Sequence, residues 1–205
     1  MNLLSHIKKQ KSLKIISADG QVFDLSILNE IILQNEIVLN NLNIKKNQVI
    51  AIVLENGIEY VTTFLSIINK SISAPLNPNY SIGEYNFYYK DLKPKILITN
   101  FKKDHPAVKS AKARKIKILN IKDYIFFNNS LSKQNASNEN SKPTYSDIAL
   151  ILHTSGTTSK PKMVPLSHKN LLKSSANISK SLQLKKKDRN VILMPSFHIH
   201  GIVAS

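Results

Sequence analysis

Residues 48–76 read QVIAIVLENGIEYVTTFLSIINKSISAPL, and this stretch decides the fold class. Residues 48–54 form a continuous apolar run, which is typical of a strand buried on both faces of a sheet. The next residues carry apolar side chains at helical spacing, namely Ile58, Val61, Phe64, Leu65 and Ile68. A second short strand is predicted over 71–76. Strand, helix and strand in this order predict two parallel strands joined by a right-handed crossover.

The same alternation continues towards the C-terminus. Ser81 and Glu84 form a capping-box pattern that opens a predicted helix over 81–92. A strand is predicted over 95–99, a helix over 105–115 and a further strand over 116–121. Repeated strand–helix units predict an α/β fold with open, mostly parallel sheets flanked by helices on both faces.

The residues before this region have a different pattern. Apolar and polar residues alternate on both sides of Asp19–Gly20, a pair that tolerates the positive φ of a tight turn. We therefore expect a β-hairpin over 14–26. A helix is predicted over 26–42, with Ser26 as its N-cap.

A change of composition divides the chain. Residues 126–146 are rich in Asn, Ser and Lys and contain few residues that a core could bury, so they are predicted to form an exposed loop or linker. This leaves residues 1–125 as an N-terminal α/β subdomain and residues 147–205 as a separate portion. In that second portion, an apolar run predicts a buried strand over 148–152.

Composition and charge exclude several classes of protein. The 205 residues carry a formal net charge of +16, from 29 Lys and Arg against 13 Asp and Glu. The lysines are scattered along the chain, which favours a solvated basic surface over a nucleic-acid interface. The absence of cysteine excludes disulfides, thiol catalysis and cysteine metal sites. With neither a signal-peptide pattern nor an apolar run of about 20 residues, we expect a cytoplasmic protein without a membrane span.

One polar stretch is a candidate ligand site. Residues 153–168 read HTSGTTSKPKMVPLSH and lie between the predicted strand 148–152 and a helix predicted over 167–183, with Ser167 as N-cap. A turn that leads from a strand into a helix directs backbone N–H groups towards an anion. Its hydroxyls and lysine suit phosphate oxygens, and its glycine permits close backbone approach: Thr154, Ser155, Gly156, Thr157, Thr158 and Lys162. The alternative is an ordinary Ser/Thr loop.

These motifs resemble those of a known family. TSGTTSKPK is similar to the phosphate-binding signature of adenylate-forming enzymes, which include acyl-CoA synthetases, luciferases and nonribosomal peptide adenylation domains. DIALILHTSGTT, VPLSHKNL and MPSFHIHG follow in the order of that family, and the resemblance covers about Val49 to Gly201. HTSGTTSKPK and FHIHG are most similar to oxalate–CoA ligases and related small-acid ligases. The sequence departs from the family pattern at Ser159 and Met163, where glycine is usual.

The resemblance implies a two-step reaction with ATP, Mg²⁺ and coenzyme A. A small-molecule carboxylic acid attacks the α-phosphate of ATP to give an acyl-adenylate and pyrophosphate, and the thiol of CoA then displaces AMP. By the same resemblance, Thr154, Ser155, Gly156, Thr157, Thr158 and Lys162 bind the phosphates, and residues 147–205 are the truncated start of the phosphate-binding portion. Lys162 and His198 are the implied catalytic residues, with His198 also at the wall of the acyl pocket. His153 and His168 are interpreted as structural, and no metal-ligating residue is assigned.

The resemblance also implies that part of the enzyme is missing. Members of the family continue for several hundred residues beyond the FHIHG region, so we expect the N-terminal fragment of an acid–CoA ligase that makes no acyl-adenylate alone. Three alternatives remain open. They are a fatty-acyl or aryl ligase of the same superfamily, a non-catalytic nucleotide- or nucleic-acid-binding module, and an inert truncated product.

Overall fold

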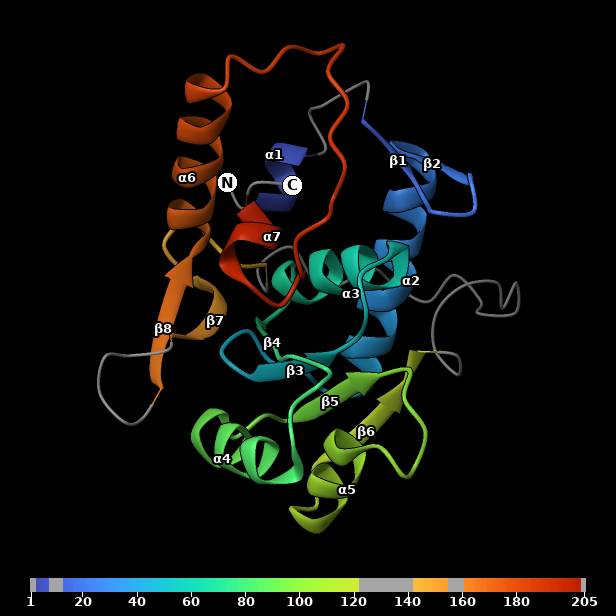
Figure 1. The fold of residues 1–205 in the computed structure, drawn as a ribbon, viewed down its shortest axis with the longest axis vertical. Helices are drawn as coiled ribbons and strands as arrows, with labels where there is room; N and C mark the ends of the chain where they lie inside the picture. The colour runs from blue at the N-terminus through green and yellow to red at the C-terminus, as the bar shows by residue number, and fades with distance from the viewer. Residues whose placement is uncertain (1–2, 8–12, 122–141, 155–160, 204–205) are drawn as a thin grey trace.

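The computed structural model describes residues 3–7, 13–121, 142–154 and 161–203 (Figure 1). Its centre is a six-stranded sheet with the order β6-β5-β3-β4-β7-β8. The strands are β3 (Val49–Val53), β4 (Ile72–Pro75), β5 (Ile96–Thr99), β6 (Lys117–Asn120), β7 (Ile148–Thr154) and β8 (Lys162–Ser167). All neighbouring pairs are parallel except β7 and β8. The predicted α/β fold with a mostly parallel sheet is thus confirmed.

Helices cover both faces of this sheet. They are α1 (Leu3–Ile7), α2 (Leu25–Asn41), α3 (Ile58–Ile68), α4 (Ile82–Leu92), α5 (Pro106–Ala113), α6 (His168–Ser181) and α7 (Ile199–Val203). Figure 1 shows α4 and α5 on the opposite side of the sheet from α2 and α3. Successive residues of β3 face opposite sides, since Ile50 and Ile52 pack in the cluster with α2 and α3 while Ala51 and Val53 pack in the cluster with α4 and α5.

The strand order creates a topological switch point between β3 and β5. From β3 the chain crosses to β4 on one side, and it then returns to β5 on the other side of β3. The connections that leave β3 and β5 therefore diverge. In open α/β sheets, ligands bind at the carboxyl ends of the strands beside such a switch point.

The N-terminal hairpin is confirmed, but the predicted start of α2 was wrong. β1 (Lys14–Ile16) and β2 (Val22–Asp24) pair antiparallel around Gly20, which has a φ of +85°. The N-cap of α2 is Asp24, whose carboxylate accepts a hydrogen bond from the N–H of Ile27 at 3.0 Å. Ser26 lies in the first turn of the helix instead. Aspartate and serine cap helices about equally well, so the position of the N-cap depended on the residue at which the hairpin ends, which is Asp24.

The capping box of α4 is confirmed by both of its hydrogen bonds. The hydroxyl of Ser81 accepts from the N–H of Glu84 at 3.3 Å, and the N–H of Ser81 donates to the Glu84 carboxylate at 2.8 Å. The Ser81 hydroxyl also donates to the Glu84 carboxylate at 2.7 Å, and this bond, together with the one from the Ser81 N–H, lowers the pKa of Glu84. The cap fixes where the crossover from β4 to β5 becomes helical.

The prediction that a polar turn leads directly from a strand into a helix was wrong. Residues 162–167 form β8, which pairs antiparallel with β7 along the edge of the sheet. The apolar residues Met163, Val164 and Leu166 lie within it, and an edge strand tolerates Pro165. Helix α6 begins only after β8, with the predicted cap Ser167, so about 17 Å of strand separates its N-terminus from Lys162, where β8 begins.

The predicted loop or linker over 126–146 lies mostly outside the described residues. β7, which follows it, pairs with β4 in the same sheet as β3 to β6. Among the residues that the structure describes, no helix is long and apolar enough to cross a membrane.

Candidate functional site

The β7–β8 hairpin carries two of the predicted phosphate-binding residues. Thr154 and Lys162 are direct partners in the antiparallel register, at the end of the hairpin that leads into residues 155–160, and both are exposed. Ser155, Gly156, Thr157 and Thr158 lie outside the described residues. The structure therefore brings a hydroxyl and a cation together where the chain enters and leaves residues 155–160.

Burial of β7 gives this hairpin a rigid base. Ala149 to Leu152 are buried in the sheet, whereas β8 is mostly exposed or half-buried. Met163, where the family usually has glycine, pairs with His153 and is 38% exposed. Its side chain thus adds to the surface of the edge strand beside Lys162.

His153 links the end of β7 to helix α4. Its Nε2 lies 2.8 Å from the carboxylate of Asp91, and its side chain is only 4% exposed. Its ring also packs edge-on against Tyr88, with 4.8 Å between the ring centres. These contacts agree with the structural role predicted for His153, and they hold the neighbouring Thr154 in place.

His168 is the second histidine interpreted as structural, and it is completely buried. Its backbone N–H donates to the carbonyl of Asp147 at 3.0 Å, and its Nδ1 accepts from the N–H of Leu3 at 3.2 Å. Burial lowers its pKa, although the nearby Asp147 works in the opposite direction. His168 therefore joins α1 and the residue before β7 to the start of α6, and burial favours the neutral form of its ring.

His198 lies on a turn that leads into α7. Its N–H donates to the carbonyl of Pro195 at 3.0 Å, and its own carbonyl accepts from the N–H of Ile202 at 3.1 Å. The imidazole is exposed and packs against the ring of Phe197, with 4.6 Å between the ring centres. An exposed imidazole on an ordered turn is free to contact a substrate.

This turn is attached to the carboxyl end of β3 and the start of α3. The side-chain amide of Asn56 bonds to backbone groups of Met194 and Ser196, and the hydroxyl of Tyr60 donates to the carbonyl of Ser196. The sequence analysis missed both residues, because nothing in the spacing of positions about 140 residues apart indicates contact. Asn56 and Tyr60 lie where the chain leaves β3 and enters α3, and only the folded structure places this connection beside residues 194–196.

The predicted residues do not form one connected cluster. Among the described residues, no hydrogen bond or ion pair joins His198 to Thr154 or Lys162. In the same part of the chain, no group of three or more His, Cys, Asp or Glu side chains could hold a metal ion.

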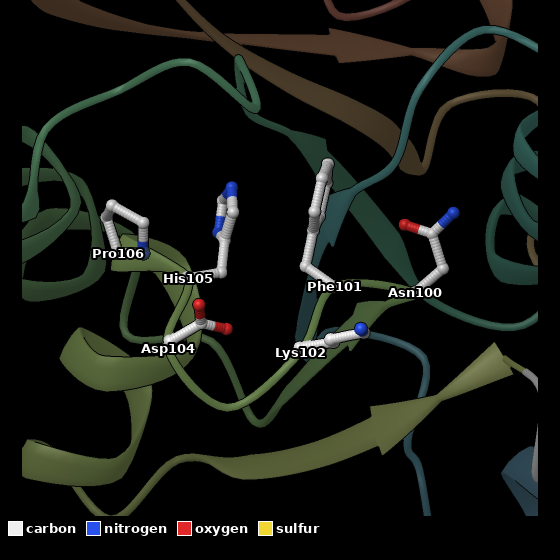
Figure 2. A pocket seen from close by; sticks show the side chains of 6 residues that line it. All are labelled: Asn100, Phe101, Lys102, Asp104, His105 and Pro106. Carbon is white, nitrogen blue, oxygen red and sulfur yellow. The ribbon is translucent and has the colours of Figure 1, made fainter.

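A separate hollow of about 500 Å³ lies at the carboxyl end of β5 (Figure 2). It is lined by Asn100, Phe101, Lys102, Asp104, His105 and Pro106. The rings of Phe101 and His105 stack at 4.0 Å, and Nδ1 of His105 accepts from the N–H of Ala107 to cap α5. Partial burial lowers the pKa of His105. Of the predicted site residues that the structure describes, none lines this hollow.

Solved structures show where this arrangement of strands and helices occurs. The crystal structure of apo MatB from Rhodopseudomonas palustris superimposes with a TM-score of 0.84 at 21% identity, covering 99% of this chain and 42% of that one. The o-succinylbenzoate CoA synthetase MenE from Bacillus subtilis, in complex with its acyl-adenylate intermediate, matches with a TM-score of 0.81 at 22% identity, covering 100% and 52%. At these identities the likeness establishes the fold.

Relatives of known sequence identify the family. The oxalate–CoA ligase of Saccharomyces cerevisiae is 36% identical over 190 residues, which cover 77% of this chain and 34% of that protein. The oxalate–CoA ligase of Arabidopsis thaliana is 36% identical over 175 residues, covering 81% and 34%. The chain thus spans about a third of the length of these relatives. The model of the family described as AMP-binding enzyme matches residues 37–205, and the chain therefore belongs to this family.

Proposed function

We propose that this chain is the N-terminal part of an AMP-forming acid–CoA ligase that acts on oxalate or another short carboxylic acid. The observation that carries the proposal is the match of residues 37–205 to the family, with two oxalate–CoA ligases at 36% identity among the relatives. The proposed reaction activates the acid with ATP and passes it to CoA. A fatty-acyl or aryl ligase is the nearest alternative within the family.

The hairpin at the end of β7 is proposed to hold the phosphates of ATP. Lys162 supplies a mobile positive charge, and its strand partner Thr154 supplies a hydroxyl donor. Charge stabilisation and positioning contribute most to phosphoryl chemistry of this kind. The role also includes Ser155, Gly156, Thr157 and Thr158, by resemblance alone. Bound Mg²⁺ would share the phosphate charge.

His198 is proposed to contact the acid. Its imidazole is exposed, while its backbone is held on both sides by the turn and by α7. This combination suits a side chain that orients a carboxylate. We further propose that adenylation requires residues that this chain does not contain, because it spans only about a third of the related ligases.

Nucleotide binding tests this proposal. The purified chain is titrated with MgATP in a calorimeter, beside the variants Lys162→Ala and Lys180→Ala. Lys180 is another exposed lysine, in the last turn of α6. We expect ATP to bind the wild-type chain and Lys180→Ala alike, and Lys162→Ala about tenfold more weakly, because a charge-assisted contact to phosphate contributes about 1.5–3 kcal/mol when fully formed. ATP–pyrophosphate exchange by the chain alone is expected to be absent.

A parallel titration with single-stranded DNA separates the alternatives. Salt-sensitive DNA binding that is unchanged in Lys162→Ala, together with no ATP binding, would replace the ligase proposal with a nucleic-acid-binding module. Appreciable pyrophosphate exchange by the chain alone would instead overturn the requirement for further residues.

A further inference from the structure

Asn56 joins two distant parts of the chain through its side-chain amide. It lies in the turn that follows β3, at the carboxyl edge of the sheet. Its Nδ2 donates to the carbonyl of Met194 at 2.9 Å, and its Oδ1 accepts from the N–H of Ser196 at 2.8 Å. The residue between these two is Pro195, which has no N–H. One amide therefore recognises the backbone on both sides of a proline.

Tyr60 completes the attachment from the first turn of α3. Its hydroxyl donates to the carbonyl of Ser196, so Ser196 is bonded at both its N–H and its C=O. Tyr60 and Ser196 are 4% and 6% exposed, and burial raises the pKa of Tyr60. The residues before this turn are mostly exposed, with Val191 at 72% and Leu193 at 83%. Packing of those residues contributes little to fixing where the turn lies.

A short series of backbone hydrogen bonds connects this attachment to His198. The carbonyl of Pro195, the residue between the two partners of Asn56, accepts the N–H of His198, and the carbonyl of His198 accepts the N–H of Ile202 in α7. Gly201 of α7 approaches Pro195 so closely that an added Cβ would lie 2.3 Å from the Pro195 carbonyl oxygen. A displacement of residues 194–196 would therefore move the backbone that carries His198.

We propose that Asn56 is a positioning residue that sets the location and orientation of His198. Asn56 is itself exposed and belongs to no hydrophobic cluster, so its removal has little effect on the core, although it takes the acceptor from the N–H of the buried Ser196. Its two bonds act instead on one turn. The inference rests on the proposed function only for the role of His198 towards the acid, and the attachment itself can be measured without any substrate.

The test compares Asn56→Ala, Asn56→Asp and a matched control in the 205-residue chain. The control is Asn86→Ala, because Asn86 also accepts two side-chain hydrogen bonds across elements, from Ser110 at 2.8 Å and Arg114 at 3.3 Å. Amide hydrogen exchange and the ring signals of His198 are followed by NMR. Asn56→Asp keeps an acceptor for the Ser196 N–H but loses the donor to Met194.

In Asn56→Ala we expect exchange of the Ser196 amide to accelerate about five- to thirtyfold, as for the loss of one or two hydrogen bonds. The ring signals of His198 are expected to shift and broaden. Asn56→Asp should retain part of the Ser196 protection, and Asn86→Ala should change neither readout.

Unchanged Ser196 exchange and unchanged His198 signals in Asn56→Ala would overturn the proposal. An equal effect in Asn86→Ala would overturn it as well, because it would indicate a general loss of stability. If Asn56→Ala fails to fold, Asn56→Asp decides by the same two signals. A chain that binds no ATP but behaves as expected here would refute the proposed function and leave the attachment intact.

Discussion

Replacement of Gly201 by alanine tests the close packing of α7 on the turn at Pro195. A Cβ at this position would lie 2.3 Å from the carbonyl oxygen of Pro195, 2.7 Å from its carbonyl carbon and 3.0 Å from the carbonyl oxygen of Met194. All three are backbone atoms, so no side-chain rotation relieves the contact. Ordinary contacts with a Cβ begin at 3.4 Å, so α7 or the turn has to move by about 1 Å.

The expected loss follows from two opposing terms. Alanine favours a helix over glycine by about 1 kcal/mol, and overpacking of a closely packed site costs about 1–3 kcal/mol. The contacts with Gly201 are closer than those of real Cβ atoms, so overpacking should exceed the gain in helix propensity. We expect Gly201→Ala to lower the free energy of unfolding by about 1–2 kcal/mol, or the melting temperature by about 2–8 °C.

Gly83→Ala is the matched control. Gly83 is in the first turn of α4, and its added Cβ would meet only the hydroxyl of Ser81 at 3.9 Å. This variant should be as stable as the wild type or up to about 1 kcal/mol more stable. Urea denaturation of both variants measures the difference. If Gly201→Ala proves as stable as Gly83→Ala, the close approach of α7 to Pro195 is refuted.

Three further outcomes concern the sheet and its supports. Lys46→Met should destabilise the chain by up to about 1 kcal/mol at pH 7. Partial burial raises the pKa of Asp147, but the ion pair with Lys46 at 2.6 Å and hydrogen bonds from Thr144 lower it to about 2. The stabilisation is therefore present above pH 3.8, and the denaturation curves of the wild type and Lys46→Met should converge near pH 2. Ile50→Ala should lower the free energy of unfolding by about 2–5 kcal/mol, since Ile50 is fully buried in β3; a loss below 1 kcal/mol would contradict this burial. Stability should also fall as the pH drops below 6.5, because burial lowers the pKa of His168 and the unfolded chain then binds the proton more tightly than the folded chain. If His168→Gln shows the same pH dependence as the wild type, protonation of His168 is not the cause.

The parallel core of the sheet could be predicted because its strands are buried on both faces. Continuous apolar runs such as 48–54 have few other interpretations when helical spacing follows each of them. The capping box could also be predicted, since Ser81 and Glu84 lie only three positions apart in the sequence. In each case the deciding interactions are local or depend on hydrophobic pattern alone.

The antiparallel edge strand β8 was not predicted, for a physical reason. Residues 162–167 contain a proline and a serine, which favour turns, and a lysine, which is uncommon in strands. These residues form a strand because they pair with β7, and such pairing is a tertiary interaction that the local sequence does not reveal. The same holds for Asn56, whose partners lie 138 and 140 residues away.

The candidate site was only partly predictable. The signature around Gly156 was recognised by its residues, yet its expected setting at a helix N-terminus was wrong, because α6 starts at the far end of β8. Among the predicted residues that the structure describes, Thr154 and Lys162 therefore depend on the hairpin rather than on a helix dipole. Thr154 and Lys162 are adjacent across the hairpin, as a shared role requires.

Pro165 in β8 has a consequence for how this chain behaves in solution. A sheet edge with a full row of free N–H and C=O groups invites strands of other molecules to add to it. Pro165 lies at this edge opposite Ile151 and contributes no N–H, and the strand begins with a charged lysine. Both features disfavour the addition of a strand from another molecule, so we expect β8 to limit aggregation through this edge. The same strand forms one side of the proposed nucleotide-binding hairpin.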